Sequence, residues 1–594
     1  MGDAAVHRSL FYAIIVIYFV IMIAVSVVLE RLNRNTSDYF RSGCRATWWL
    51  TGVSAFMSSF SAWSFTGLAD LTFRSGGSAL WVSSGLLAGV LVNAVLMGPW
   101  FRQLRIVTFS EAVDQRFGRA TQQFYAWLHV VKQIFFGAVT LCSVSVFLIV
   151  IFHFPLMPTI IVIGAIAVTY AAIGGTWAVM SNSFLQGLIL VPVIIAVAVL
   201  SLVEIGGVGK LFAAIQQNGL TTDYAVIKPG GWGTELAVGW VLAMFLQSFI
   251  GTASVISAPF FFKVKDGTEA RKLAFLQAFL TIIGGVLFVI PPAVARLLHA
   301  KGVAATGLER PGEGAYAVAS LSVLPPTIFA LIVVTMLATT MSTLNNQLNI
   351  NAGLLVRDIL PPLQRKFGWR TFSDRGEVRL SQAATAILGS AMVSLACYFA
   401  RAGGRGLFAM MMDVIALVAV PLYVPLFLVT FVRKVPSWAA IVSVAAGFVW
   451  SVLGYFSAEF FGDMWSFQTK AVGCCIVGTV AYLLCMPFWR TSPAEYQARV
   501  AEFYTKMLRP VDFATEVGSE NDRTQYRTIG FFAVLIGALI SSLAFIDGSA
   551  RERLTIGFIG GANLLVGWIF WMLSRRPAPA QIMAESAKPI LEVK

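Results

Sequence analysis

Apolar runs long enough to cross a membrane recur along the whole sequence. A membrane-spanning helix needs about 20 consecutive, mostly apolar residues. Runs such as Phe184–Leu202 come close to that length and lack the alternation of a transmembrane β-strand. In lipid the backbone must satisfy its own hydrogen bonds, so these runs are predicted to be helices. Only 12% of the 594 residues are charged, against about 25% in soluble domains, which excludes an ordinary soluble protein.

The pattern predicts an all-α, polytopic membrane protein with about fifteen transmembrane helices. No small-residue cleavage site follows the first apolar stretch, so it is predicted to be a retained helix rather than a signal peptide. The predicted spans are residues 9–29, 47–72, 77–99, 122–151, 157–173, 181–204, 236–262, 272–297, 326–356, 379–400, 407–431, 437–458, 466–489, 527–546 and 554–574.

Arginine and lysine are concentrated in alternate loops between these predicted helices. One loop of the rich set holds Arg102, Arg105, Arg116 and Arg119, whereas the opposite set holds few cations. Cytoplasmic loops are enriched in Arg and Lys, which predicts an N-terminus outside and a C-terminus in the cytoplasm of a cell-membrane protein. The bias accounts for the net charge of +14 without a nucleic-acid partner. The lipid bilayer is the expected partner, and no obligate protein partner is evident.

Motifs of catalysis and tight metal binding are absent from the sequence. The six cysteines lie mostly in apolar runs without CxxC spacing, so buried thiols are predicted rather than disulfides or a metal site. Neither HExxH nor GxSxG occurs, and the chain is not predicted to be an enzyme. The polar insert 490–526 is too short for a catalytic domain. Its amphipathic part near Tyr496–Leu508 is predicted to lie along the membrane surface.

The second predicted helix has a small, polar middle. Its sequence WWLTGVSAFMSSFSAWSFTGLAD contains Ser54, Ser58, Ser59, Ser61 and Ser64. Small residues and hydroxyls can form a surface on which helices pack. The interpretation we favour is a discontinuous helix, in which freed carbonyls coordinate a cation and polar side chains hold a substrate.

The ninth predicted helix, LATTMSTLNNQLNINAGLLVRD, also carries polar groups within an apolar span. Thr339, Ser342 and Thr343 stand at i, i+3 and i+4, which places their oxygens on one helix face. Oxygen ligands of this hard type suit a small alkali cation.

These two segments and three others, in the same order, resemble the sodium/solute symporter family, which includes the sodium/proline and sodium/galactose carriers. The similarity covers about residues 37–460. The matching stretches are SDYFRSGCRATWWLTGVSAFMSSFSAWSFTGLA at the start, GGTWAVMSNSFLQG at 174–187, KVKDGTEAR at 263–271, ATTMSTLNNQL at 338–348 and GEVRLSQAATAILG at 376–389.

The resemblance implies a LeuT-like core of two inverted repeats, each of five helices. The first repeat would cover residues 37–205 and the second 206–431. An extra N-terminal helix and loop would occupy residues 1–36. Four peripheral helices with the insert 490–526, predicted to be cytoplasmic, would occupy 432–594.

The resemblance also implies sodium-coupled symport that imports a small polar organic solute by alternating access, with Na⁺ as the coupling ion. The sodium site would comprise the carbonyls of Met57, Phe60 and Thr339 and the hydroxyls of Ser342 and Thr343. A frequent Asp of the family is replaced by Ser183, which favours one sodium per cycle. A proton-coupled carrier with Asp413 as the proton site, or a transporter-like sensor, stays an alternative.

The substrate is not inherited from the resemblance. The sugar contacts of the galactose carrier are replaced at Trp63–Ser64 and at Ser83 or Ser84, and an Asp of the proline carrier appears as Ser59. A charge at mid-membrane costs about 2.5–3.5 kcal/mol on insertion scales, so charged residues within spans should face a cavity or a partner. In family members that carry organic acids, a cation in the fourth predicted helix can hold the carboxylate. The candidate substrate residues are Ser59, Trp63, Ser83, Lys132, Gln247 and Asp413.

Simpler interpretations of these residues stay open. Lys132 could extend its ammonium toward the membrane surface, and Asp413 could make a structural hydrogen bond. The two could also pair with each other. Gln247, beside a predicted helix break near Gly251, could serve only helix packing.

Overall fold

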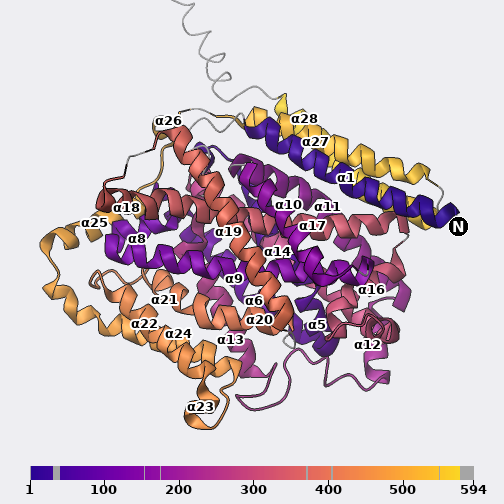
Figure 1. Cartoon of the computed structure of the whole chain (residues 1–594), viewed down its shortest axis with the longest axis horizontal. Coiled ribbons are helices and arrows are strands. Elements are labelled where there is room, and N and C mark those ends of the chain that lie inside the picture. The colour runs from indigo at the N-terminus through magenta and orange to yellow at the C-terminus, as the bar shows by residue number, and fades with distance from the viewer. Residues whose placement is uncertain are drawn as a thin grey trace, which may run out of the picture. The chain divides into compact units, whose positions relative to one another are not determined.

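The computed structural model describes residues 2–30, 41–152, 154–173, 176–324, 326–369, 372–402, 406–518, 520–546 and 549–575. Within these residues all regular elements are helices, apart from an isolated parallel bridge between Ala46 and Val264 (Figure 1). The predicted all-α class is therefore confirmed. The chain divides into two compact units, Met1–Gly518 and Ser519–Lys594.

The first half of unit 1 contains the helices α1 to α12. Their bounds are α1 Gly2–Glu30, α3 Trp48–Ser59, α4 Ala62–Phe65, α5 Gly67–Ser75, α6 Trp81–Val92, α7 Gly98–Gln103, α8 Phe109–Phe117, α9 Arg119–Phe152, α10 Leu156–Ile173, α11 Thr176–Ile205 and α12 Val208–Gln217. A π-helical segment, Asn93–Met97, joins α6 to α7 without a break.

The second half of unit 1 runs from α13 to α26. Its helices are α13 Val238–Thr252, the 3-10 segment η4 Val255–Lys263, α14 Gly267–Leu298, α15 Ala300–Ala304, α16 Ala315–Val323, α17 Pro326–Gly353, α18 Leu360–Phe367, α19 Asp374–Ala402, α20 Leu407–Val414, α21 Val420–Leu428, α22 Ala439–Tyr455, α23 Ser457–Phe461, α24 Phe467–Leu484, α25 Ala494–Leu508 and α26 Phe513–Glu516.

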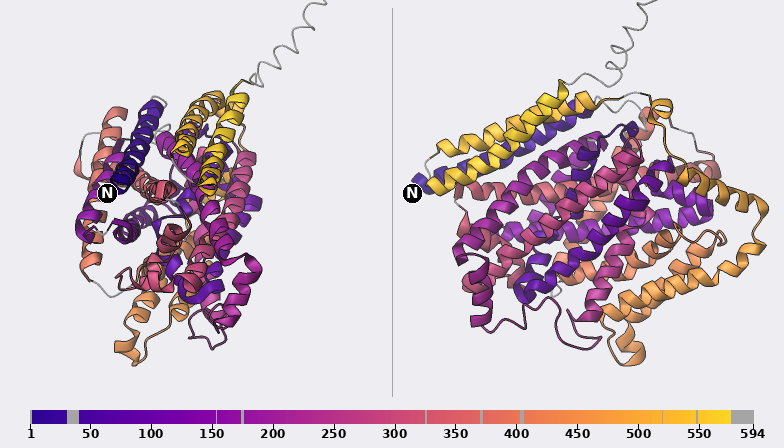
Figure 2. Two further views of the ribbon diagram at one scale, coloured as in Figure 1. Left: turned by 90° about the vertical axis from the view of Figure 1, so that its right-hand side faces the viewer. Right: turned by 180° about the vertical axis from the view of Figure 1, so that it is seen from behind.

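Unit 2 is a pair of helices, α27 Asp522–Ser542 and α28 Ala550–Ser574, that lie side by side (Figure 2). Glycines let their backbones approach closely, since a Cβ on Gly537 would lie 2.9 Å from the carbonyl oxygen of Gly560. Ser549 and Glu552 form a reciprocal capping box at the start of α28.

Among the described residues, 11 helices are long and apolar enough to cross a membrane, or up to 12 if the bent pair α13–η4 is one span. Two shorter apolar helices, Leu156–Thr169 and Ala439–Tyr455, fall below that length. The structure therefore has the helices of a multi-pass membrane protein. Fewer described helices meet the length and apolarity expected of a membrane span than the roughly fifteen predicted from the sequence.

The serine-rich second span is interrupted, as predicted. Helix α3 ends at Ser59, and Phe60 and Ser61 have extended backbones before α4 begins. The side chain of Ser61 accepts a hydrogen bond from the backbone N–H of Trp63 at 3.3 Å, which caps α4. The break leaves backbone carbonyls at the end of α3 without helical partners.

The predicted break near Gly251 is also present, because α13 ends at Thr252 and η4 continues at an angle of 45°. Two glycines on α6 let α13 pack closely against it. A Cβ on Gly85 would lie 2.2 Å from the carbonyl oxygen of Phe245, and one on Gly89 would lie 2.7 Å from Thr252 Cβ. Asn93 Nδ2 donates to the Thr252 carbonyl at 3.0 Å, which holds the broken end of α13 in place.

The insert forms the predicted amphipathic helix, α25, but its apolar face does not lie on a membrane surface. Tyr496, Val500, Phe503, Tyr504 and Met507 are buried. They belong to a hydrophobic core shared with α7, α8 and η4, and α25 packs on α7 and α8. The prediction of a surface-lying helix is therefore wrong, because protein covers the apolar face.

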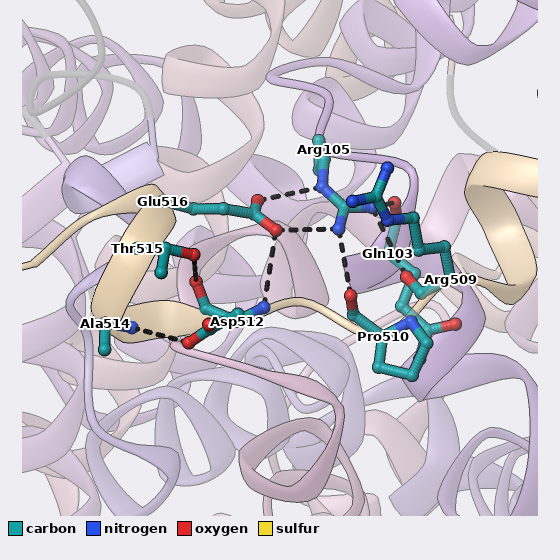
Figure 3. Close-up of polar contacts among 8 residues, drawn as sticks. All are labelled: Gln103, Arg105, Arg509, Pro510, Asp512, Ala514, Thr515 and Glu516. Carbon is teal, nitrogen blue, oxygen red and sulfur yellow. Dashed lines mark hydrogen bonds and ion pairs between the residues drawn. The ribbon is translucent and has the colours of Figure 1, made fainter.

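Arg105 fastens the segment after α25 to the loop that follows α7 (Figure 3). Its guanidinium donates to both carboxylate oxygens of Glu516, at 2.8 and 2.7 Å, and to the carbonyl of Pro510 at 3.0 Å. A further bond of 2.7 Å to the Gln103 carbonyl orients the guanidinium. Paired bonds of this kind are stronger than single neutral ones.

Replacing Glu516 with Gln should loosen α26 at neutral pH. Hydrogen bonds from Arg105 lower the pKa of Glu516 below its ordinary value. This docking is therefore fully stabilising above the ordinary Glu pKa of about 4.3 and is lost as the pH falls through the lower folded value. At pH about 7, hydrogen exchange in residues 510–517 should be faster in Glu516→Gln than in the wild type.

Glu502→Gln is the matched control, since Glu502 pairs with Lys506 within α25 itself, at 2.6 Å. Its exchange in residues 510–517 should match the wild type. Equal exchange in both variants would show that Arg105 does not fasten this segment through Glu516.

Candidate functional site

A cavity of about 350 Å³, here called the central cavity, lies where the breaks of two helices meet. Ser59 and Trp63 line it from the α3–α4 break, Ser83 from α6 and Gln247 from α13. Four of the predicted substrate residues thus share one cavity. Its wall is otherwise mostly apolar, with Phe60, Leu68, Leu86, Phe136, Met244, Met411, Met412 and Ile415 among the lining residues.

A second cavity of about 230 Å³, here called the side cavity, adjoins the central one. The two share lining residues that include Ser59, Gln347 and Tyr423. Lys132 and His129 of α9 line the side cavity only. The predicted candidate Asp413 lines neither, although its neighbour Met412 lines the central cavity.

The ends of α3 and the middle of α17 meet beside the central cavity. Thr343 Oγ1 donates to the Phe60 carbonyl oxygen at 3.1 Å, across the break. Met57 and Thr339 lie about one turn earlier on their helices and are buried. The Thr339 hydroxyl donates to the Met336 carbonyl at 2.9 Å within α17.

Two further contacts at this junction were not expected. Ser342 Oγ of α17 lies 2.7 Å from Ser183 Oγ of α11. Ser183, which the sequence singled out only as a replacement for a frequent Asp of the family, therefore contacts a proposed site residue. Asn346 Nδ2 donates to Ser58 Oγ at 3.1 Å and links α17 to α3 a second time. Among the described residues, no group of three or more His, Cys, Asp or Glu side chains could hold a metal. Neutral hydroxyl and carbonyl oxygens are the hard ligands gathered here.

Lys132 is held by Tyr423, a residue that the sequence interpretation missed. Lys132 Nζ donates to Tyr423 Oη at 3.2 Å and lies over the rings of Tyr423 and Phe136, at 5.1 and 5.7 Å from their centroids. These contacts do not include Asp413, so the two charged residues do not pair. The sequence could have identified Tyr423 by its position inside the apolar helix α21, because a tyrosine hydroxyl within such a helix usually has a hydrogen-bond partner.

Two glutamines present unsatisfied oxygens at the cavity walls. Gln247 Oε1 and Gln347 Oε1 are buried and accept no hydrogen bond from the described residues. Gln247 is only 3% exposed, and its amide nitrogen contacts the sulfurs of Met244 and Met412. A buried carbonyl oxygen without a donor is costly. These oxygens can accept hydrogen bonds from donors of a polar solute.

Comparison with known proteins finds matches over most of the chain. The model of the Sodium:solute symporter family matches residues 39–447. The osmoregulated proline transporter OpuE of Bacillus subtilis is 24% identical over 383 residues, which cover 63% of this chain and 74% of that protein. A sodium/proline symporter of Staphylococcus aureus is 23% identical over 370 residues, covering 58% of this chain and 67% of the symporter.

A solved structure of a Na⁺-coupled sialic acid symporter, in a substrate-bound outward-open state, is similar in fold. Its TM-score is 0.69 at 18% identity, covering 81% of this chain and 98% of the other. At this identity the likeness shows the fold alone.

Proposed function

The chain belongs to the Sodium:solute symporter family, and from this premise we propose that it imports a small polar organic solute together with sodium by alternating access. The family and the relatives are transporters and not enzymes. The observation that carries the proposal is the central cavity, which lies against two broken helices and beside a cluster of neutral oxygens. Broken helices at a binding site are typical of such carriers.

The proposed sodium ligands are the carbonyls of Met57, Phe60 and Thr339 and the hydroxyls of Ser342 and Thr343. Their support is the 3.1 Å contact between Thr343 Oγ1 and the Phe60 carbonyl, which brings oxygens of both helices together. A sodium ion bound to Thr343 Oγ1 and to the Phe60 carbonyl oxygen would link α17 to the end of α3. Sodium binding would thereby set the position of the α3–α4 break, which lines the solute cavity.

For the solute, we propose Ser59, Trp63, Ser83 and Gln247 as contacts, because all four line the central cavity. The unsatisfied Gln247 Oε1 supports a solute with a hydrogen-bond donor. Asp413 lines neither cavity, so we do not propose it as a solute contact. We further propose the two inverted repeats 37–205 and 206–431, and an N-terminus outside the cell.

Sodium coupling is tested with purified protein in proteoliposomes. Uptake of labelled proline, galactose and small carboxylates is measured under an inward sodium gradient and after choline replaces sodium. At least one solute should accumulate, and its uptake should fall to the level of empty vesicles in choline. Accumulation that persists in choline and follows an imposed pH gradient would favour a proton-coupled carrier instead.

A further inference from the structure

The C-terminal end of α18 carries exposed cations and aromatic rings, here called the α18 surface: Arg365, Lys366, Phe367 and Trp369. Phe367 and Trp369 are 57% and 56% exposed, and their rings stack with centroids 5.4 Å apart. Lys366 Nζ lies 5.8 Å from the centroid of the Phe367 ring. Neither Arg365 nor Lys366 forms an ion pair with a side chain that the structure describes. Both cations are therefore available to an anion from outside the chain.

The α18 surface is fixed to the body of unit 1. The π-helical segment η6, Leu354–Ile359, continues α17 into α18 without a break. The carboxylate of Asp358 in η6 accepts a hydrogen bond from Thr108 Oγ1 at 2.8 Å. At the other end of α18, the backbone N–H of Trp369 donates to the Gln364 carbonyl at 3.0 Å. The fold therefore sets the position of the exposed rings.

The end of unit 1 that carries the α18 surface is rich in cations. Residues 357–379 contain six: Arg357, Arg365, Lys366, Arg370, Arg375 and Arg379. Helix α18 lies at the same end as α8 and α25 (Figure 1). The segment 102–119, which contains α8, is also rich in arginine. Segments of this kind are typical of the cytoplasmic side, where the membrane surface carries anionic lipids.

We propose that the α18 surface binds an anionic phospholipid of the cytoplasmic leaflet. Arg365 and Lys366 meet the charged headgroup, because cations beside an anionic membrane surface are attracted to it. The rings of Phe367 and Trp369 lie between the headgroups and the upper acyl chains, where aromatic side chains concentrate. A soluble anion would satisfy the two cations but leave the two rings in water. A phospholipid covers both parts of the surface.

Two simpler explanations account for only part of the α18 surface. The helix dipole favours cations in the last turn of a helix, but it does not explain why two aromatic rings beside them are uncovered. Aromatic rings at a membrane interface need no particular headgroup, but that preference does not explain two cations without an ion pair. Charge complementarity therefore favours an anionic lipid over a zwitterionic one.

The test compares phospholipids that share acyl chains and differ in their headgroups. Binding of phosphatidylglycerol and of phosphatidylcholine to the purified full chain in neutral detergent is measured by native mass spectrometry. Phosphatidylglycerol should bind about tenfold more tightly, because two cations contribute to its binding. Inorganic phosphate should not displace it. Equal affinity for the two lipids, or displacement of phosphatidylglycerol by an equal concentration of inorganic phosphate, would overturn the proposal.

Charge variants assign the preference to the α18 surface. The double variant Arg365→Gln/Lys366→Gln should lose most of the preference for phosphatidylglycerol, and its thermal stability should stay unchanged because both side chains are exposed. Arg271→Gln/Lys272→Gln is the matched control, since these are adjacent exposed cations near the start of α14 and Lys272 already pairs with Glu269 at 2.9 Å. The control should keep the preference. Equal loss in the two double variants would contradict the proposal.

Variants of the rings test the other part of the surface. Phe367→Ser/Trp369→Ser should weaken the binding of both lipids by a similar factor, because the rings contact the lipid whatever its headgroup. Unchanged affinity for both lipids would place the rings outside the contact and contradict the proposal. These measurements require neither sodium nor a solute, so their outcome is independent of the transport function.

Discussion

Replacing Thr343 with Ala is expected to raise the sodium concentration for half-maximal binding about tenfold or more. The Thr343 hydroxyl lies 3.1 Å from the Phe60 carbonyl and is one of the proposed sodium ligands. Its loss leaves the ion one fewer oxygen and removes a link between α17 and the end of α3. A tenfold change corresponds to about 1.4 kcal/mol of binding free energy.

Binding of labelled sodium to the purified protein measures this effect without knowledge of the solute. Thr340→Ala is the matched control, because Thr340 is fully buried on the same helix and its hydroxyl donates to the Met336 carbonyl at 2.9 Å. Thr343→Ser keeps a hydroxyl and should retain most of the affinity. If Thr343→Ala and Thr340→Ala bind sodium with equal affinity, the proposed site is in the wrong place.

The second large effect is expected for Arg116→Met, which should lower the free energy of unfolding by about 2–4 kcal/mol. Arg116 is only 1% exposed. Its guanidinium donates to Tyr496 Oη at 2.6 Å, to Tyr504 Oη at 3.3 Å and to the Arg433 carbonyl at 2.7 Å. These bonds join α8 to α25 and to the residues after α21, and a methionine replaces none of them.

Denaturation in detergent micelles measures the change. The control is Arg119→Met, because Arg119 is an exposed residue at the start of α9 and its loss should change stability by less than about 0.5 kcal/mol. Protease cleavage between residues 509 and 518 should also become faster in Arg116→Met, since α25 loses its anchor. Equal stability of the two variants would refute the anchoring role.

Several features followed from local sequence. The serine-rich composition of the second span predicted a discontinuous helix, and the backbone leaves the helix at Phe60 and Ser61. The prediction of a break near Gly251 was similarly confirmed by the end of α13 at Thr252. Hydroxyls at 339, 342 and 343 share one helix face because helical spacing alone dictates it. Such features depend on residues within a few turns of one another.

Contacts between segments that are distant in the chain could not be predicted from local sequence. Lys132 and Asp413 both looked out of place in apolar helices, yet of these two residues only Lys132 lines the central or the side cavity, and its hydrogen-bond partner is Tyr423. The sequence pattern predicted that α25 has an apolar face. That pattern does not distinguish a face that lies on a membrane from one that packs on protein. Packing on α7 and α8 decided between them.

The sequence by itself determined that this chain is helical and membrane-spanning, where two of its helices break, and which oxygens share a helix face, because hydropathy and helical periodicity act along the chain. Only the tertiary structure decided which side chains meet at the two cavities, that Lys132 faces one of them without a carboxylate partner, and that the insert covers α7 and α8. Those outcomes depend on the packing of segments hundreds of residues apart, on which local pattern places no constraint.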